Sequence, residues 1–397
     1  MYDVAIVGAG PGGSSAGRQL GKMGFNVCLI DKSNLPRDKP CGGGFSPHLL
    51  SEFPYVGRRS SAFVKSISHS AVLHSPNGHV VLRGKSDMVM TLRTDFDSTL
   101  FRLAIEEGAY PTTPFNVVSV RINEGSVALF SSRGEEIRAR AVIGADGASS
   151  IVARQTGLNR RWPAGSITAC QVMEVPVTES DIASCYGPDK EYHLYTNVGG
   201  SPGYGWVFPK STTVNVGLGI VANRARRLPT LFLLFTKMLK RGGLIPQRVD
   251  SFRARGALVP TTGPIPMSLT RRCLLVGDSA GMVNPLTGGG IAYAMHAGRL
   301  AGAVLGKALE HDRLDAASLI QYQRAWNRDF GHEIKGQLAA QKLFTSPLDG
   351  VLFEIGDRDT EIQRMVASLM SGSIAGREKV GPIALRALWV CLREALS

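Results

Sequence analysis

Three N-terminal glycines and one acid have the spacing needed to hold a dinucleotide. Gly8, Gly10 and Gly13 form the pattern G-x-G-x-x-G, and Asp31 follows 18 residues beyond the last of them. The first glycine permits a tight turn, the second lets the backbone approach a pyrophosphate, and the third lets a helix and a strand pack closely. An acid at Asp31 would bind ribose hydroxyls and repel a 2′-phosphate. These residues therefore predict a site for FAD or NAD in preference to NADP.

The elements that must position these residues follow from the same segment. An apolar strand is expected over Val4–Val7, a helix over Ser14–Met23 and a second strand over Asn26–Ile30. This is the β-α-β order that the glycine pattern requires, and the helix N-terminus at Ser14 would face the phosphates.

Two later strands also end at a glycine-acid corner. One breaks at Gly144-Ala145-Asp146-Gly147, and the other ends at Gly277-Asp278, where the carboxylate is placed to accept hydrogen bonds from a ribityl chain. A turn containing Gly289 and Gly290 then enters a helix over Ile291–Leu305, whose N-terminus would stabilise negative charge on a reduced flavin. In this order the three motifs resemble the FAD-binding fold of the para-hydroxybenzoate hydroxylase type.

Arg93 adds a fourth cofactor candidate. It precedes Thr94-Asp95-Phe96-Asp97, which we read as a capping box that opens a helix. The apolar face of that helix comprises Phe96, Leu100, Leu103 and Ala104. Arg93 resembles the flavoprotein arginine that reaches the cofactor, and a solvated charge at the end of a strand is the alternative.

A short aromatic stretch lies in the middle third of the chain. Tyr204, Trp206 and Phe208 alternate along one expected strand, although aromatic residues make up only 7% of the sequence. Alternate side chains of a strand point to one face, so these rings would form a continuous wall suited to a long apolar ligand. A core strand is the plainer reading of such a run. A seven-residue gap leads to Gly217 and Gly219.

Two motifs distinguish among flavoproteins. The aromatic stretch with its G-x-G, and the segment Arg37-Asp38-Lys39-Pro40-Cys41-Gly42-Gly43-Gly44, resemble the geranylgeranyl reductase family, as does Pro-Leu-Thr-Gly-Gly-Gly-Ile at 285–291. The resemblance covers roughly residues 1–305. It implies an FAD-dependent enzyme that saturates isolated double bonds of a prenyl chain, with hydride from flavin N5 and a proton added to the two alkene carbons.

The resemblance also implies residue roles. Cys41, Gly42 and Gly44 would lie beside the flavin, while Tyr204, Trp206, Phe208, Gly217 and Gly219 would form the lipid site. Cys41 and Tyr204 are the catalytic candidates; ordered water is an alternative proton source, and a small residue lining the FAD channel is the plainer reading of Cys41. The full set of expected cofactor residues is Gly8, Gly10, Gly13, Ser14, Asp31, Cys41, Gly42, Gly44, Arg93, Asp146, Gly277, Asp278, Gly289, Gly290 and Ile291.

Other flavoprotein activities stay open at this stage. An aromatic monooxygenase would share every FAD motif, a flavin halogenase should carry W-x-W-x-I-P, which is not found, and an electron shuttle would need no apolar cavity. Only one dinucleotide fingerprint occurs. The external electron donor, NAD(P)H or reduced ferredoxin, would therefore dock without a Rossmann domain of its own.

Composition limits partners and location. The net charge of +13 favours anionic partners, and no zinc-finger spacing or base-reading helix points to nucleic acid. Six scattered cysteines, without paired histidine spacing, argue against a structural metal and a disulfide framework. His69, His74 and His79 are read as surface residues. We expect a cytoplasmic monomer without a signal peptide or spanning helix, with peripheral contact to the inner membrane face as an open alternative. An amphipathic helix at 383–396 is one element that could provide that contact, and docking onto its own domain is the plainer reading of such a helix.

The expected architecture is mixed α/β. A discontinuous Rossmann-like FAD-binding domain comprises residues 1–60, 85–160 and 255–305. An antiparallel-sheet substrate domain comprises 61–84 and 161–254, and a helical C-terminal region comprises 306–397.

Overall fold

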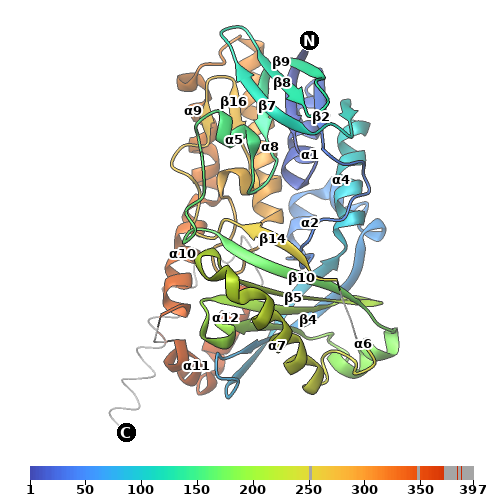
Figure 1. Ribbon diagram of the computed structural model, residues 1–397, viewed down its shortest axis with the longest axis vertical. Helices are drawn as coiled ribbons and strands as arrows, with labels where there is room; N and C mark the ends of the chain where they lie inside the picture. The colour runs from blue at the N-terminus through green and yellow to red at the C-terminus, as the bar shows by residue number, and fades with distance from the viewer. Residues whose placement is uncertain (250–252, 347–348, 371–381, 383–385, 387–397) are drawn as a thin grey trace.

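The protein is built around two sheets, seen one above the other in Figure 1. The structure is a computed structural model that describes residues 1–249, 253–346, 349–370, 382 and 386. Each sheet has eight strands within this part of the chain. The predicted combination of a Rossmann-like layer, a second antiparallel layer and a helical C-terminal region is confirmed.

The first sheet positions the dinucleotide motifs. Its order is β15-β16-β9-β1-β2-β6, with β7 and β8 extending from β9. The central pairs β1–β2 and β1–β9 are parallel, and their apolar runs are buried, as expected for a sheet covered on both faces. The strands span Tyr2–Val7 (β1), Val27–Ile30 (β2), Ala109–Thr112 (β6), Val117–Ile122 (β7), Val127–Ser131 (β8), Glu136–Gly144 (β9), Leu269–Thr270 (β15) and Cys273–Leu275 (β16).

Small residues let two helices approach closely on this sheet. Helix α1 (Pro11–Lys22) packs against α8 (Ile291–Glu310), and a side chain at Gly298 would overlap the carbonyl oxygen of Gly12. This packing brings the N-termini of α1 and α8 to the same edge of the sheet, where parallel strands end and ligands bind. The remaining helices around this layer are α2 (His48–Glu52), α3 (Pro54–Gly57), α4 (Arg93–Glu106), α5 (Ile151–Gln155) and α9 (Ala316–Trp326).

The second sheet carries the aromatic stretch. Its order is β14-β10-β13-β12-β11-β4-β5-β3, and its pairs are antiparallel except β11–β4. The strands span Gly44–Phe45 (β3), Val64–His74 (β4), Val81–Thr91 (β5), Thr168–Pro176 (β10), Tyr192–Thr196 (β11), Gly203–Pro209 (β12), Thr213–Val221 (β13) and Arg255–Val259 (β14).

Helices cover both faces of the second sheet. One face packs against α6 (Glu179–Tyr186) and α7 (Leu228–Arg241), which crosses the lower half of the molecule in Figure 1. The other face carries Trp206 and Leu194 and meets side chains from α10 (His332–Phe344), α11 (Asp349–Asp357) and α12 (Thr360–Met370). Because β12 alternates, Trp206 and Val207 belong to opposite faces.

Sheet pairing extends further than the predicted domain limits. The limit at residue 84 falls inside β5, which pairs with β4 through to Thr91, and β14 pairs with β10 although it lies beyond residue 254. The amphipathic segment expected at 383–396 lies outside the described residues apart from Arg386.

The prediction that His74 lies at the surface was wrong. His74 is half-buried, its ring stacks on Tyr195 with centroids 4.1 Å apart, and its Nε2 lies 3.0 Å from Nδ1 of His193. His69 and His79 are exposed, as expected. The five-residue spacing of these histidines carries no information about β4, whose last residues are buried on both faces of the sheet: the four residues before His74 are all buried.

Candidate active site

The turn between β1 and α1 is shaped for a pyrophosphate. Gly8 has φ +104°, and a side chain there would overlap the carbonyl oxygen of Ala145. A side chain at Gly13 would overlap the carbonyl oxygen of Gly8. Around Gly10 the nearest atom to such a side chain would be an Arg37 nitrogen at 3.7 Å, so the backbone is open there. The residues fit the phosphates of a dinucleotide above the N-terminus of α1.

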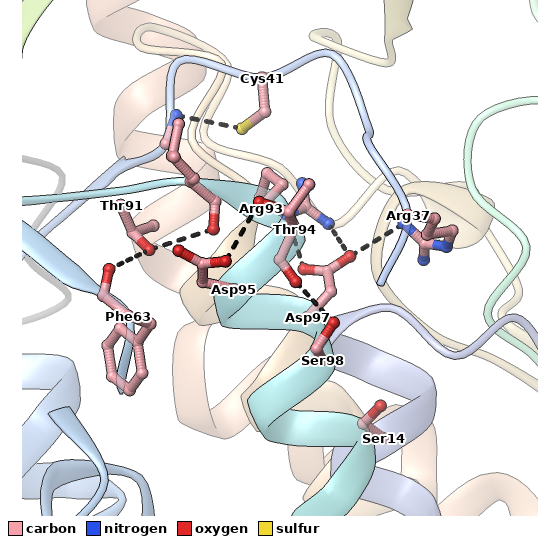
Figure 2. Close-up of polar contacts among 12 residues, drawn as sticks. Ser14, Arg37, Cys41, Phe63, Thr91, Arg93, Thr94, Asp95, Asp97 and Ser98 are labelled. Atoms are coloured by element: carbon pink, nitrogen blue, oxygen red, sulfur yellow. Dashed lines mark hydrogen bonds and ion pairs between the residues drawn. The ribbon is translucent and has the colours of Figure 1, made fainter. Parts of the chain in front are cut away.

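A chain of charges connects Asp31, the acid expected at the ribose, to the start of α4. Asp31 Oδ2 accepts hydrogen bonds from the backbone N–H of Ala9 at 3.0 Å and from Arg37 Nε at 3.1 Å. Arg37 also donates from NH1 to Asp97 Oδ2 at 3.0 Å, and Figure 2 shows it beside Asp97. Asp97 in turn accepts two bonds from Arg93, from Nε at 2.7 Å and from NH2 at 2.8 Å. Asp31 is therefore held in place by both the glycine turn that contains Ala9 and the Arg37 segment.

The predicted capping box at Thr94 was wrong. Helix α4 begins at Arg93, two residues before the Asp95 start that a Thr94 cap implies, and its N-cap residue Leu92 provides no side-chain hydrogen bond. Asp97 does not turn back to the helix start because the Arg93 guanidinium occupies both of its oxygens. A buried ion pair with two hydrogen bonds is a stronger partner than a single backbone N–H. The predicted apolar face of α4 is buried as expected.

Arg93 is a fixed cation at the edge of the cavity. Burial alone would lower its pKa, but Asp97 and Cys41 outweigh that effect and raise it. Burial alone would raise the pKa of Asp97. The charge and hydrogen bonds of Arg93 outweigh this effect, so the pKa of Asp97 is lowered. Figure 2 shows the Cys41 loop above the start of α4, where Cys41 Sγ accepts from the backbone N–H of Gly43 at 3.4 Å. The guanidinium therefore keeps its charge close to the Cys41 side chain.

The three aromatic rings form the wall that their spacing predicts. Tyr204 and Trp206 have ring centroids 5.4 Å apart, and Trp206 and Phe208 follow at 6.4 Å. A side chain at Gly217 on the next strand would overlap the indole of Trp206. One at Gly219 would lie 2.8 Å from the sulfur of Cys170. The two glycines thus make room for wall residues and do not themselves line the cavity.

Tyr204 connects the wall to the turn before α8. A side chain at Gly288, where φ is +70°, would overlap the hydroxyl oxygen of Tyr204. Burial raises the pKa of Tyr204 well above its usual value, and Cys170 and Cys41 add to the effect. Tyr204 therefore stays a protonated phenol over the whole physiological range.

A buried polar network fixes the back of the wall. Asn215 Oδ1 accepts from Trp206 Nε1 at 2.7 Å, and Asn215 Nδ2 donates to the Cys41 carbonyl at 3.0 Å and to Glu174 at 2.7 Å. Glu174 also accepts from Lys210 Nζ at 2.7 Å and 2.8 Å, and Lys210 is only 1% exposed. The network ties β10, β12 and β13 to the Cys41 loop. The network gives no signal in the sequence, because single Asn, Glu and Lys residues have no characteristic spacing.

One continuous cavity joins the two layers. It is lined by most of the predicted residues, including Gly10, Cys41, Gly42, Gly44, Arg93, Tyr204, Trp206, Phe208, Gly277, Asp278, Gly289, Gly290 and Ile291. Gly8, Gly13, Ser14 and Asp31 support the neighbouring turn without lining it. Asp146 differs from the prediction: its oxygens accept from the backbone N–H groups of Ile151 and Val152 at 2.7 Å and 3.2 Å, and the cavity is lined instead by Ala145 and Gly147.

Several cavity residues were not predicted. Cys170 and Val172 reach it from β10, at alternate positions that period-2 patterning could have identified. Burial, followed by the effect of Cys41, raises the pKa of the Cys170 thiol to about 12. Glu52 also lines the cavity, and it lies 3.0 Å from Nε2 of His296, whose Nδ1 lies 2.9 Å from Asp329. Helix α2 had given no sequence signal, because it is only five residues long.

Comparison with known proteins shows an FAD-binding domain and relatives that are similar over most of the chain. Residues 1–239 match the model of the FAD binding domain family. Digeranylgeranylglycerophospholipid reductase 1 of Methanococcoides burtonii is 31% identical over 376 residues, which cover 90% of this chain and 88% of that protein.

Solved structures agree with this relationship. The crystal structure of a geranylgeranyl bacteriochlorophyll reductase-like protein from Thermoplasma acidophilum superposes with a TM-score of 0.81 at 25% identity, covering 98% of this chain and 99% of that one. A halogenase structure superposes with a TM-score of 0.71 at 17% identity, covering 98% and 85%, and this likeness shows the fold alone. The FAD-domain match, the aromatic wall and the full-length relatives lead to one conclusion: the chain belongs to the geranylgeranyl reductase family of flavin-dependent oxidoreductases.

Proposed function

We propose that this protein saturates isolated C=C bonds in the geranylgeranyl chains of a digeranylgeranyl glycerophospholipid. The observation that carries the proposal is the continuous cavity, in which the predicted flavin loops and the aromatic wall face the same space. The names of relatives such as digeranylgeranylglycerophospholipid reductase 1 of Methanococcoides burtonii support the choice of a glycerophospholipid head group. Asp278, Gly289 and Gly290 would hold the flavin ring end of FAD, and Gly10 would adjoin its pyrophosphate.

The chain's own residues meet the needs of alkene reduction. The chemistry supplied by bound, reduced FAD is hydride donation. The alkene π bond is replaced by two C–H bonds, one formed with hydride and one with a proton. No carbonyl polarises such an alkene, so its position must be fixed and water excluded. Trp206 and Phe208 provide an apolar wall for that purpose, and their faces tolerate positive charge developing on a tertiary carbon.

Cys41 and Tyr204 are the proposed proton-handling groups. Both line the cavity, and a thiol and a phenol are each chemically able to exchange a proton. Tyr204 is kept protonated by burial, while Cys41 lies near the permanent charge of Arg93. Cys41→Ser and Tyr204→Phe, compared under single turnover in H₂O and D₂O, separate their roles. The residue that transfers the proton is the one whose replacement slows the chemical step and changes the solvent isotope effect.

The function is tested with chemically reduced, FAD-loaded enzyme and geranylgeranyl compounds of different head groups. The expected product gains two hydrogen atoms for each double bond, fastest with the glycerophospholipid. Hydroxylation of an aromatic compound in the presence of oxygen, with no saturated prenyl product, would overturn the proposal.

We propose NAD(P)H or a reduced ferredoxin as the electron donor. Because the sequence has a single dinucleotide fingerprint, either donor would dock transiently, without a Rossmann site of its own. Anaerobic mixing with NADH, NADPH or reduced ferredoxin identifies the donor by which of them bleaches the flavin absorbance. Failure of all three would contradict this part of the proposal and leave the prenyl reduction itself untouched.

A further inference from the structure

Helix α7 exposes an apolar stripe on the outer surface of the second sheet. Its inner face buries Leu231, Phe232, Phe235 and Leu239, whereas Leu233, Leu234 and Met238 are 54%, 56% and 44% exposed. Leu234 and Met238 are four residues apart and lie on one face of the helix, and Leu233 flanks them on the outward side. Among the described residues they form the one place where three large, strongly exposed apolar side chains fall within six consecutive positions.

Cations surround this stripe. No aspartate or glutamate occurs between residues 222 and 249. Arg224, Arg226 and Arg227 are exposed just before the helix, and Lys237 and Arg241 are exposed along its second half. Three arginines at a helix N-terminus oppose the helix dipole, which favours negative charge at that end. Their position is therefore unfavourable for the helix itself and suits an anionic partner.

We infer that α7 and the arginines before it form a docking surface for an anionic lipid bilayer. Aliphatic side chains between flanking cations are the arrangement of helices that lie in a membrane interface: the apolar face enters the boundary between headgroups and acyl chains, and the cations meet acidic headgroups. A second copy of this chain is a poor occupant, because it would bring two arginine clusters together. No helix in the described part of the chain has the length and hydropathy to cross a bilayer, so the contact is peripheral.

The docking surface lies next to one end of the cavity wall. Arg227 NH2 donates to the carbonyl oxygen of Gly199 at 3.3 Å, and a side chain at Gly199 would overlap Leu231. Gly199 belongs to the turn that leads into β12, where Tyr204 begins the wall. In Figure 1, α7 lies across the sheet that contains β10, far from the end of the first sheet formed by β7, β8 and β9. A bilayer bound at α7 would therefore be adjacent to the turn that opens the aromatic strand.

The test measures binding of the FAD-loaded, full-length protein to vesicles of phosphatidylcholine alone or with 30% phosphatidylglycerol, a fraction of about a third chosen to give a strong negative surface potential. Sedimentation should show binding to the acidic vesicles that falls as salt rises. Leu233→Gln with Leu234→Gln should lower the partition coefficient by about tenfold or more, as should Arg224→Glu with Arg226→Glu. Activity on substrate dispersed in detergent should stay at the wild-type level for both pairs.

A charge-matched control uses exposed arginines of the first layer. Arg102→Glu with Arg133→Glu changes the net charge equally but lies away from α7, and it should retain binding. Equal loss in this control would show that only net charge matters and would overturn the inference. So would wild-type binding to neutral vesicles alone, no vesicle binding at all, or loss of a dimer in the leucine variant, since that outcome assigns α7 to a second copy. Flavin content and circular dichroism confirm that each variant is folded.

Discussion

Asn215 donates a hydrogen bond from Nδ2 to the carbonyl oxygen of Cys41 across 174 residues of sequence, at 3.0 Å. The same side chain accepts from the indole N–H of Trp206. One amide thus sets the position of a proposed proton-handling loop relative to the wall that would hold the substrate. A displacement of the Asn215 side chain would therefore disturb both the Cys41 loop and the aromatic wall.

Asn215→Leu should impair the reaction without removing FAD. The substitution leaves Trp206 Nε1 and the Cys41 carbonyl without their partner, and each buried unsatisfied group costs about 1–3 kcal/mol. We expect a lower melting temperature, and a lower kcat for prenyl reduction in the variant that still folds. Differential scanning calorimetry measures the melting temperature, and flavin absorbance during the reaction measures kcat. Asn223→Leu, at an exposed position, is the control, and an Asn215 variant with wild-type stability and kcat would contradict the assigned role.

Gly217→Ala should damage the wall selectively. The added methyl overlaps the Trp206 ring, which must move, at a cost of about 1–3 kcal/mol for overpacking. Long-chain substrates should lose activity, seen as a raised KM, while FAD stays bound. Gly125→Ala is the matched control, because nothing lies within 4 Å of a side chain there. Loss of flavin from Gly217→Ala would show that the wall supports the cofactor instead.

Asp97→Asn and Asp95→Asn form a matched pair on one helix. Asp97 is fully buried and holds the Arg93 guanidinium, so neutralising it leaves a buried charge poorly paired, at about 3–5 kcal/mol. Asp95 pairs with Lys65 near the surface, where such a contact contributes at most about 1 kcal/mol. Urea denaturation should show the difference, together with weaker FAD retention in Asp97→Asn through the Arg37 connection to Asp31. Similar midpoints for the two variants would refute the importance of this chain of charges.

The His74–His193 pair should make the fold sensitive to acid. Burial lowers the pKa of His74 to about 4, with Arg83 adding to the effect, and burial, His74 and Arg83 lower that of His193 to about 3. The unfolded chain, with pKa values near 6.5, therefore binds more protons below pH 6.5, and the free energy of unfolding should fall as pH drops from about 6.5 towards 4.

Replacing both rings by phenylalanine should flatten this dependence. His74→Phe with His193→Phe keeps an aromatic partner for Tyr195 and removes both titrating groups. Exposed His79→Gln should leave the pH profile unchanged. Urea midpoints measured from pH 4 to pH 7.5 give the comparison, and a double variant as acid-sensitive as the wild type would rule the pair out as the cause.

The sequence predicted those features that depend on periodicity or on a backbone requirement. Gly8 and Gly13 are required because any dinucleotide-binding turn of this kind leaves no room for a side chain there. Tyr204, Trp206 and Phe208 share a face because they alternate along one strand. Features that depend on a distant partner were not predictable. Arg37 meets Asp97 across 60 residues of sequence, and nothing near His74 in the sequence shows that it meets His193. Asn215 belongs to the same class.

The contact of Tyr204 with the Gly288 turn has a thermodynamic consequence. The residue belongs to the lipid wall, while the turn leads into the helix expected at the flavin, so the two ligands share a boundary. If occupation of one side shifts this contact, the affinities of cofactor and lipid are linked, and linkage is reciprocal. The factor by which FAD changes the affinity for lipid must equal the factor by which lipid changes the affinity for FAD. Flavin dissociation measured with and without a prenyl chain in place would then report the same coupling as lipid binding measured with and without FAD.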